Sequence, residues 1–584
     1  MITNKLQWKI GGEAGFGIMT TGVIFSKICT RGGLRTFAYP EYPSLIRGGH
    51  NTYQVTIDAQ QATSQIHNVH LLVALNKASV TAHAYELMNG AAVIYDPADF
   101  AEEAPNLVGK EIVWVPVAMN DILKAKGAER IARNTIAIGA SFGLLNYPFE
   151  YIEQVLKDWF GVKKPKLVED NLVLAKAGYD ATYQKYANYQ FQLEPIKENA
   201  RHMVLSGNRA IALGALQAGM KFYAAYPMTP SSDILGYMAK VERDMNIVVK
   251  HTEDEIAAMN MIIGAGMAGV RAMTGTSGGG FALMTEALGM AGMAEVPIVT
   301  VMGQRPGPST GMPTWTAQGD LRMTLHASQG EYPMIVLAPG DIEECFYYTY
   351  KAFNLAEQYQ LPVIILVDKY VQESWQSVVP FDTSKLKINR GKVVAQAELD
   401  KILANKEKFL RYKLEPDGIS ARSLPGMAGG RYIATSYEHD EYSTTTELEH
   451  EVTAQYDKRF KKLDTFLRND SEAPKLYGEP NAAVTIVGWG STKLTVLETL
   501  RLAKEQNISV NYLHFVQIQP LPVQAVQQAF ANAKKTICIE GNKTGQLEGW
   551  LKQQADVKCT KSLHKYGGRP FYPEEILEQV KKLL

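Results

Sequence analysis

A chain of 584 residues, 46% hydrophobic and 21% charged, is long enough to form roughly three or four domains with apolar cores. Sixty Lys and Arg balance sixty Asp and Glu, and this zero net charge argues against proteins that bind nucleic acid or anionic membranes. Glycines interrupt the N-terminal segment before a secretory hydrophobic region could form, and no later run reaches the ~18 apolar residues of a membrane span. We therefore expect a cytoplasmic globular protein that acts on small molecules or on other proteins.

The four cysteines lie far apart and show neither C-x-x-C spacing nor a mixed Cys and His pattern; they are Cys29, Cys345, Cys538 and Cys559. Buried, unreactive thiols are the simplest interpretation of all four. We expect that this chain binds no metal ion and no iron–sulfur cluster by itself.

The first block, residues 1–193, alternates short apolar strands with helical stretches, a pattern typical of layered α/β domains. Its opening strand leads into the glycine-rich loop GGEAGFG at 11–17 and then into a helix. Such a loop is either a tight turn that needs positive φ or a phosphate site at a helix N-terminus, and its glycines do not match the dinucleotide fingerprint in register. Arg47, in the nearby segment YPSLIRGGHN, modestly favours a ligand that carries phosphate.

The second block, residues 194–379, contains loops that directly follow predicted strands, and ligands bind at this end of open α/β sheets. In the loop YPMTPSSD, Thr229 stands between two prolines that stiffen the backbone around its hydroxyl. In the loop GQRPGPSTGMPT, Arg305 comes just after a strand and could direct its guanidinium group at a carboxylate. A well-capped turn and a solvated arginine are the plain alternatives, but the ordered surroundings favour a binding site.

Three acids begin the helix in the stretch HTEDEIAAMNMIIGAGMAG, and the helix dipole alone explains any two of them. Glu255 differs from Glu253 and Asp254 because the residues after it are almost all apolar or small, which allows close packing. Its carboxylate is therefore expected to face the protein interior. Since a buried carboxylate without a partner is costly, Glu255 should have one.

Residues 380–474 are rich in charged and polar side chains, and we predict an extended crossing segment in place of a compact domain. The last block, residues 475–584, returns to the α/β pattern with the stretches VTIVGWGST and TICIEGN on either side of a helix. The whole sequence thus predicts an α/β, multi-domain protein with mainly parallel sheets.

Several of these motifs occur together in one known family. An acid before an Ala- and Gly-rich helix, then TGTSGGG and AEVPIVTVMGQR, resemble the pyrimidine-binding domain of thiamine-diphosphate enzymes. The motifs YPMTPSSD, EDEIAA and GQRPGPSTGMPT are similar in particular to the α subunit of 2-oxoacid:ferredoxin oxidoreductases. The first block, with GGEAGFGIMTTG and YPEYPSLIRGGHN, resembles the γ subunit of that family fused ahead of α. The resemblance implies a Rossmann-like γ domain, a thiamine-diphosphate pyrimidine-binding domain and a transketolase C-terminal-like domain.

The resemblance also supplies a partner for the Glu255 carboxylate, namely N1′ of the aminopyrimidine ring of thiamine diphosphate, where a hydrogen-bonded carboxyl group activates the cofactor. By the same resemblance Thr229 binds the reacting oxygens of the substrate and Arg305 binds its carboxylate, with Thr314 as a selectivity contact. The other implied contacts are Tyr226 and Ser277 beside the cofactor, and Arg47 or Asn542 for coenzyme A.

The family needs a GDG motif with a following Asn to hold Mg²⁺ and the diphosphate, and this sequence contains no GDG. The resemblance therefore implies a separate β subunit that holds Mg²⁺, the diphosphate and a [4Fe-4S] cluster, and that passes electrons to ferredoxin. This polypeptide would then be inactive alone. An (αβ)₂ heterotetramer is expected, with the active site between the two kinds of chain.

The fused order of γ and α is similar to enzymes that convert 2-oxoglutarate, coenzyme A and oxidised ferredoxin reversibly to succinyl-CoA, CO₂ and reduced ferredoxin. Pyruvate or an aryl pyruvate is the alternative substrate in the same family, because side-chain selection also depends on the unseen subunit. A non-catalytic assembly module is the alternative from another class, and the joint presence of Glu255, Thr229 and Arg305 argues against it.

Overall fold

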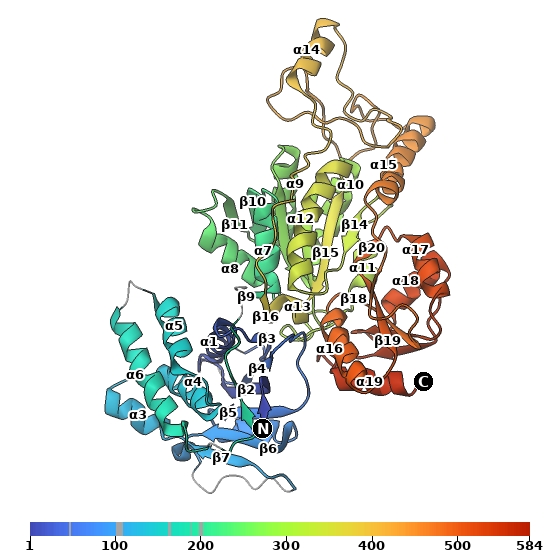
Figure 1. Ribbon diagram of the computed structural model, residues 1–584. Coiled ribbons are helices and arrows are strands. Elements are labelled where there is room, and N and C mark those ends of the chain that lie inside the picture. Colours follow the sequence, from blue (N-terminus) through green and yellow to red (C-terminus); the bar gives the residue numbers. More distant parts are fainter. Residues whose placement is uncertain (46–47, 101–108, 162–164, 187, 198–201) are drawn as a thin grey trace.

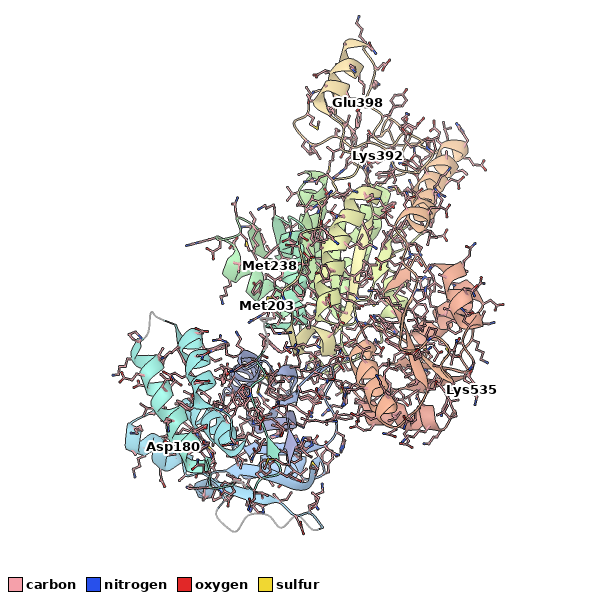
Figure 2. The ribbon with its side chains drawn as sticks, viewed as in Figure 1. Asp180, Met203, Met238, Lys392, Glu398 and Lys535 are labelled. Atoms are coloured by element: carbon pink, nitrogen blue, oxygen red, sulfur yellow. The ribbon has the colours of Figure 1, made fainter. Side chains whose placement is uncertain are left out.

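The computed structural model describes residues 1–45, 48–100, 109–161, 165–186, 188–197 and 202–584. Figure 1 shows three layered α/β domains along the chain, coloured blue to cyan, green to yellow, and orange to red, with an arm that stands away from them and carries α14. Figure 2 places Lys392 and Glu398 on that arm. Among the described residues, no helix combines the length and apolar character needed to cross a bilayer.

The first domain is built on a mixed sheet in the order β7-β6-β5-β2-β4-β3-β16-β9. Strands β2, β5, β6 and β7 are parallel, whereas every pair from β2 through β4 and β3 to β9 is antiparallel. This sheet departs from the mainly parallel arrangement expected, because the connection from β3 to β4 is too short for the crossover that a parallel neighbour requires. The strands are β7 (Val113–Pro116), β6 (Leu87–Tyr95), β5 (Val69–Ala74), β2 (Lys5–Glu13), β4 (His50–Asp58), β3 (Arg35–Glu41), β16 (Trp375–Val378) and β9 (Met203–Ser206).

Helices cover both faces of this sheet, and the core includes the stacked rings of Trp8, Phe25 and Phe142. The helices are α1 (Ile18–Arg31), α2 (Lys77–His83), α3 (Met119–Lys126), α4 (Arg133–Leu144), α5 (Phe149–Phe160) and α6 (Pro165–Thr182). Two short 3-10 turns, η1 (Pro97–Asp99) and η2 (Arg130–Ala132), and the small pair β1 (Ile2–Thr3) with β8 (Phe191–Gln192) complete the domain.

Two strands of the first sheet come from the second block of the sequence. Trp375 of β16 pairs with Ala38 of β3 on one side and with Ser206 of β9 on the other. The hydrogen-bonded ladder therefore continues past residue 193, and the first and central domains share a sheet.

The central domain has the sheet order β11-β10-β12-β13-β15-β14-β20, parallel except for β20 at one edge. Its strands are β11 (Val248–His251), β10 (Phe222–Ala225), β12 (Ala272–Ser277), β13 (Ile298–Gln304), β15 (Pro362–Asp368), β14 (Ile335–Leu337) and β20 (Gln517–Gln519). Its helices are α7 (Gly207–Gln217), α8 (Ser232–Val241), α9 (Glu255–Met267), α10 (Gly278–Met293), α11 (Leu321–Leu325), α12 (Ile342–Tyr359) and α13 (Lys369–Glu373).

Side chains of α7, α8 and α12 belong to one apolar cluster of this domain, and those of α9 and α10 belong to another. The small residues of α9 let it approach the sheet closely. A Cβ at Gly266 would lie 2.6 Å from the Pro297 carbonyl oxygen, so only glycine fits there.

The segment 380–474 contains α14 (Gln396–Ala404) and the long α15 (Glu449–Asn469), and the rest is largely irregular. A small apolar cluster of Val394, Leu399 and Phe409 holds the outer part together. The last domain has the sheet order β17-β19-β18-β21-β22. Its elements are β17 (Lys475–Tyr477), β18 (Val484–Trp489), α16 (Thr492–Glu505), β19 (Val510–Phe515), α17 (Val523–Ala531), β21 (Thr536–Glu540), α18 (Gln546–Ala555), β22 (Lys561–His564) and α19 (Pro573–Lys581).

Candidate active site

Four neighbouring strands of the central sheet, β11, β10, β12 and β13, end at the same edge. Because these strands are parallel, the loops that follow them meet there although they are far apart in the sequence. At this end lie Glu255, Thr229, Ser277 and Arg305, in the order of the strands; Ser277 is the last residue of β12, and the other three follow their strands. The sheet therefore brings together residues from all of the predicted loops of the second block.

Glu255 is the first residue of α9, and the Asp254 side chain caps this helix by accepting a hydrogen bond from the Ala257 N–H at 2.8 Å. Only 3% of Glu255 is exposed, while Glu253 is exposed. Within the described part of the chain, Oε1 of Glu255 has no hydrogen-bond partner. The carboxylate is thus buried, as expected, and the described residues do not supply the donor that its Oε1 needs.

A glycine makes room for this carboxylate. A Cβ on Gly280, in the first turn of α10, would lie 2.4 Å from Oε1 of Glu255 and 2.2 Å from the Thr276 hydroxyl oxygen. Distances this short are not tolerated, so any side chain at position 280 would displace Glu255. The absence of a side chain at Gly280 therefore leaves the space that the Glu255 carboxylate occupies.

Thr229 and Arg305 are directly connected. The Arg305 guanidinium group donates a hydrogen bond from Nη1 to the Thr229 carbonyl oxygen at 2.9 Å, and the Thr229–Pro230 peptide is cis. Arg305 is half-buried; burial lowers the pKa of its guanidinium group, and the nearby Asp320 carboxylate opposes that change. The arginine thus fixes the threonine loop and still has donors for a ligand.

Asp320 also lies in this site, although it was not among the site residues predicted from the sequence. Burial raises the pKa of Asp320 to about 6, against the effect of the positive charge on Arg305. Its backbone N–H donates to Oε1 of Gln304 at 3.1 Å, and a Cβ at Gly278 would lie 3.1 Å from its carboxylate. The available signal was an acid in the loop after the β13 strand, fifteen residues beyond Arg305. Shifted carboxyl groups of this kind cluster at functional sites.

The remaining predicted contacts differ in their surroundings. Ser277 and Thr314 are buried, and neither hydroxyl has a hydrogen-bond partner among the residues described. Both are therefore available to a ligand that enters the site. Tyr226 is 39% exposed, with its ring 6.0 Å from that of His251, so it stands at the surface of the site.

The two residues proposed for coenzyme A are not alike. Arg47 lies outside the described residues. Asn542 is buried in the last domain, where its amide donates to the Gln318 carbonyl oxygen at 3.0 Å and to Oε2 of Glu540 at 2.8 Å. Its side-chain oxygen accepts from the Thr544 N–H at 3.1 Å. Asn542 therefore already uses its polar atoms to hold the last domain against the central one.

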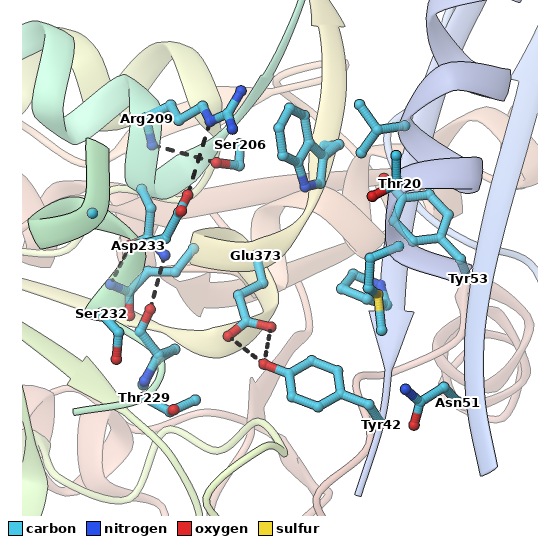
Figure 3. A pocket seen from close by; sticks show the side chains of 18 of the residues that line it. Thr20, Tyr42, Asn51, Tyr53, Ser206, Arg209, Thr229, Ser232, Asp233 and Glu373 are labelled. Carbon is cyan, nitrogen blue, oxygen red and sulfur yellow. Dashed lines mark hydrogen bonds and ion pairs between the residues drawn. The ribbon is translucent and has the colours of Figure 1, made fainter. Parts of the chain in front are cut away.

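A cavity of about 730 Å³ opens beside Thr229, between the first and central domains (Figure 3). Thr20, Asn51 and Tyr53 line it from the first domain, and Thr229 and Glu373 from the central one. Within the described ranges, no group of three His, Cys, Asp or Glu side chains could hold a metal ion. The four cysteines are all buried, in agreement with the sequence interpretation.

The buried, unpaired carboxylate of Glu255 fits a ligand that offers a ring nitrogen or N–H, and Gly280 leaves the space such a contact needs. Two family models match the chain. Residues 213–458 match a thiamine-diphosphate-binding domain of pyruvate flavodoxin/ferredoxin oxidoreductase, and residues 7–181 match a domain of pyruvate ferredoxin/flavodoxin oxidoreductase.

Similar proteins extend over the whole chain. A 2-oxoacid:ferredoxin oxidoreductase subunit alpha of Sulfolobus sp is 33% identical over 641 aligned residues, which cover 99% of this chain and 97% of the relative. The 2-oxoglutarate synthase subunit KorA of Methanothermobacter thermautotrophicus is 34% identical over 382 residues, 65% of this chain and 98% of that protein. A solved 2-oxoglutarate:ferredoxin oxidoreductase from Magnetococcus marinus, with 2-oxoglutarate, coenzyme A and succinyl-CoA bound, has a TM-score of 0.90 at 30% identity and covers 99% of both chains.

Proposed function

The chain belongs to the 2-oxoacid:ferredoxin oxidoreductases as an α subunit with a γ-like domain at its N-terminus, and from this premise we propose that it oxidises 2-oxoglutarate to succinyl-CoA and CO₂. Its central domain is a thiamine-diphosphate-binding domain. The observation that carries the proposal is the buried Glu255 carboxylate at the carboxyl end of the central sheet, the same end at which Arg305 donates to the Thr229 carbonyl oxygen.

Thiamine diphosphate, when bound, supplies a carbon nucleophile for the keto carbon and holds the electrons that CO₂ leaves behind. Glu255 holds a proton at N1′ of the aminopyrimidine ring, and the apolar start of α9 keeps water from this contact. The Thr229 hydroxyl and the Arg305 guanidinium group orient the substrate through its oxygens and its carboxylate. Thr314, Ser277 and Tyr226 are proposed as further contacts around these groups.

The site is completed by a partner β subunit that carries Mg²⁺, the diphosphate contacts and a [4Fe-4S] cluster, and that reduces ferredoxin. Exposed apolar side chains on α9 and α10 support the presence of a β subunit: Ile256 is 47% exposed, Met261 45% and Leu283 51%. They lie on α9, which begins at Glu255, and on α10, where a second subunit would cover the apolar surface. An (αβ)₂ assembly follows as the proposed form.

The choice of 2-oxoglutarate rests on relatives named for it, the archaeal KorA subunit and the Magnetococcus enzyme. Pyruvate or an aryl pyruvate is the second candidate, because many relatives are named only for 2-oxoacids. Coenzyme A is the proposed acyl acceptor, as in the solved relative.

The test is to purify the chain from its native host together with the subunits that accompany it, without oxygen. Reduction of a low-potential dye is then followed with 2-oxoglutarate, pyruvate and phenylpyruvate at a fixed coenzyme A concentration. The expected result is a kcat/KM for 2-oxoglutarate at least tenfold above the others. A preference for pyruvate would reject the substrate assignment, and an absence of reduction with every 2-oxoacid would reject the proposed function.

A further inference from the structure

The cavity between the first and central domains is much larger than a 2-oxoacid needs. Its volume is about 730 Å³, which is in the range of sites for extended organic ligands. Two tryptophans, Trp159 on α5 and Trp375 on β16, supply flat apolar surface to this cavity. Thr229, proposed to bind the reacting oxygens, lies in the wall of the same cavity. A ligand that enters between the domains can therefore reach Thr229, the residue that we propose binds the reacting oxygens.

Polar atoms on the first-domain side of this cavity lack partners. Oδ1 of Asn51 and the Tyr53 hydroxyl are buried, and neither has a hydrogen-bond partner among the described side chains and backbone. Both residues lie on β4 and line the cavity (Figure 3). Since buried polar groups are rarely left unpaired, these atoms indicate a ligand with polar groups along an apolar body.

Glu373 stands between the two sides. Glu373 is the last residue of α13, the short helix that follows β15, and 15% of its side chain is exposed. The Tyr42 hydroxyl lies 2.9 Å from each carboxylate oxygen (Figure 3). Nζ of Lys369 lies 3.4 Å from Oε2. A hydroxyl has one proton and donates to one oxygen at a time, so the carboxylate keeps free lone pairs toward the cavity.

The two neighbours of Glu373 hold it in place. Lys369 is fully buried, and its ammonium group also donates to the Pro40 carbonyl oxygen at 2.8 Å and to the Tyr39 hydroxyl at 3.2 Å. Burial and the Glu373 carboxylate raise the pKa of Tyr42, so this hydroxyl stays protonated and donates to the carboxylate. Because Tyr42 comes from the first domain, the position of Glu373 depends on contact between the domains.

We infer that Glu373 accepts the thiol proton of the acyl acceptor that reaches Thr229 through this cavity, with Tyr42 and Lys369 as positioning residues. This inference rests on the proposed function. In the step, the S–H bond breaks and its proton moves to a carboxylate oxygen of Glu373. The sulfur lone pair forms the bond to the acyl carbon, and the bond from that carbon to the cofactor breaks with its electron pair returning to the cofactor. Ferredoxin takes the two electrons of the oxidation.

A base is needed because a thiol is mostly protonated at neutral pH and an apolar cavity disfavours the thiolate further. The other carboxylate in the wall, Asp233, is less suited. It is 52% exposed, and its Oδ2 lies 3.9 Å from Nε of Arg209, so its charge is compensated at the surface. Asp233 therefore provides a matched control on the same cavity.

The experiment compares Glu373→Gln with Asp233→Asn in the purified complex, and it measures two rates. One is the single-turnover reduction by 2-oxoacid without coenzyme A; the other is steady-state turnover with coenzyme A. For Glu373→Gln we expect the first rate to stay within about twofold and the second to fall about 10²-fold at pH 7, in kcat and not only in KM. The loss should shrink about tenfold per pH unit toward the thiol pKa of about 8.5, because a thiolate needs no base.

Glu373→Asp, which keeps a carboxylate, should recover about a tenth of the wild-type turnover, and Asp233→Asn should behave like wild type. Unchanged coenzyme A turnover in Glu373→Gln, or an equal fall in both rates at every pH, would overturn the inference. Tyr42→Phe gives a second test if Glu373→Gln does not fold, with about a fivefold fall confined to the coenzyme A step as the expected result and no change as the contrary one. Failure of the proposed function would appear differently, as a wild-type complex that no 2-oxoacid reduces.

Discussion

Two buried carboxylates lie at the two ends of the helix pair α9 and α10, and they are treated in opposite ways. Glu295, just after α10, is fully buried, and its two oxygens lie 2.5 Å from Nζ of Lys458 and 2.5 Å from Nζ of Lys462, both on α15. Glu255, at the start of α9, is nearly as buried, yet none of the ion pairs among the described residues includes it.

The electrostatics of Glu295 follow from these contacts. Burial raises its pKa, but Lys458 and Lys462 lower it more, so the pKa of Glu295 lies below its usual range. The ion pairs of Glu295 with Lys458 and Lys462 attach α15, in the segment 380–474, to the central domain. The Glu255 carboxylate, which the described residues leave unpaired at the carboxyl end of the central sheet, is the one that we propose contacts the cofactor. A structural acid and a functional acid thus differ in whether the chain itself supplies an ion-pair partner, and not in how deeply the carboxylate is buried.

The sharpest test of this comparison is Glu255→Gln in the purified complex. An amide cannot exchange a proton with the cofactor ring, so we expect 2-oxoacid-dependent turnover to fall about 10²- to 10⁴-fold. The midpoint of thermal unfolding should change little, because no described residue of this chain pairs with Oε1 of Glu255 and glutamine has nearly the same size. Steady-state dye reduction and a thermal melt measure the two effects. Loss of stability with retained turnover would make Glu255 a structural acid like Glu295.

The opposite result is expected for Glu295→Ala. Removal of one partner leaves Lys458 and Lys462 buried without their counter-charge, which costs about 3 to 5 kcal/mol of unfolding free energy. Urea unfolding should report this loss, and proteolysis should reach the arm first. In the wild type, the stabilisation by the ionised Glu295 is present above the unfolded pKa of about 4.3 and is lost as the pH falls below it. Lys552→Met, in an exposed pair with Asp556, should change stability by less than about 1 kcal/mol.

Gly280→Ala is expected to disturb Glu255 without removing it. The added methyl group would overlap Oε1 of Glu255 and the Thr276 hydroxyl, at a cost of about 1 to 3 kcal/mol. Turnover should fall at least about tenfold as the carboxylate moves. Gly279→Ala is the matched control, because a Cβ there meets nothing within 4 Å. Equal turnover in the two variants would show that the position of Glu255 does not depend on Gly280.

The smallest effect is expected at Asp320. Its raised pKa, about 6, means that the folded chain binds a proton between the unfolded pKa of about 3.9 and pH 6, so stability falls as the pH rises through this window. Asp320→Asn removes this slope and should gain about 1 kcal/mol at pH 7, with no gain at pH 4. Urea midpoints at the two pH values measure it. A gain at both pH values would assign the effect to packing instead of charge.

The α/β, multi-domain architecture was predictable from the alternation of apolar strands and helices, and it is confirmed. The burial of Glu255 was predictable as well, because the residues after it are apolar or small. The roles of Glu255, Thr229, Arg305 and Thr314 stay predictions. Thr229 and Arg305 were singled out because each follows a predicted strand, and strand ends in a parallel sheet converge without any need to know the strand order. Glu255 was singled out because it begins an apolar helix, and the roles of all four residues came from the family resemblance.

Features that depend on pairs of distant residues could not be predicted. Glu295 stands in an apolar stretch with no basic residue nearby, and its lysines come more than 160 residues later. Glu373 meets Tyr42 only because the two domains are in contact. Asp320 follows an ordinary loop, and its burial results from packing that local sequence does not describe.

The sheet that the first and central domains share limits where the chain can be divided into two polypeptides. A cut near residue 193 would give an N-terminal fragment without β16 and β9, so the edge of β3 would lose its hydrogen-bonded neighbour at Ala38. Exposed β edges recruit other chains, so such a fragment is expected to aggregate unless the remainder is made in the same cell.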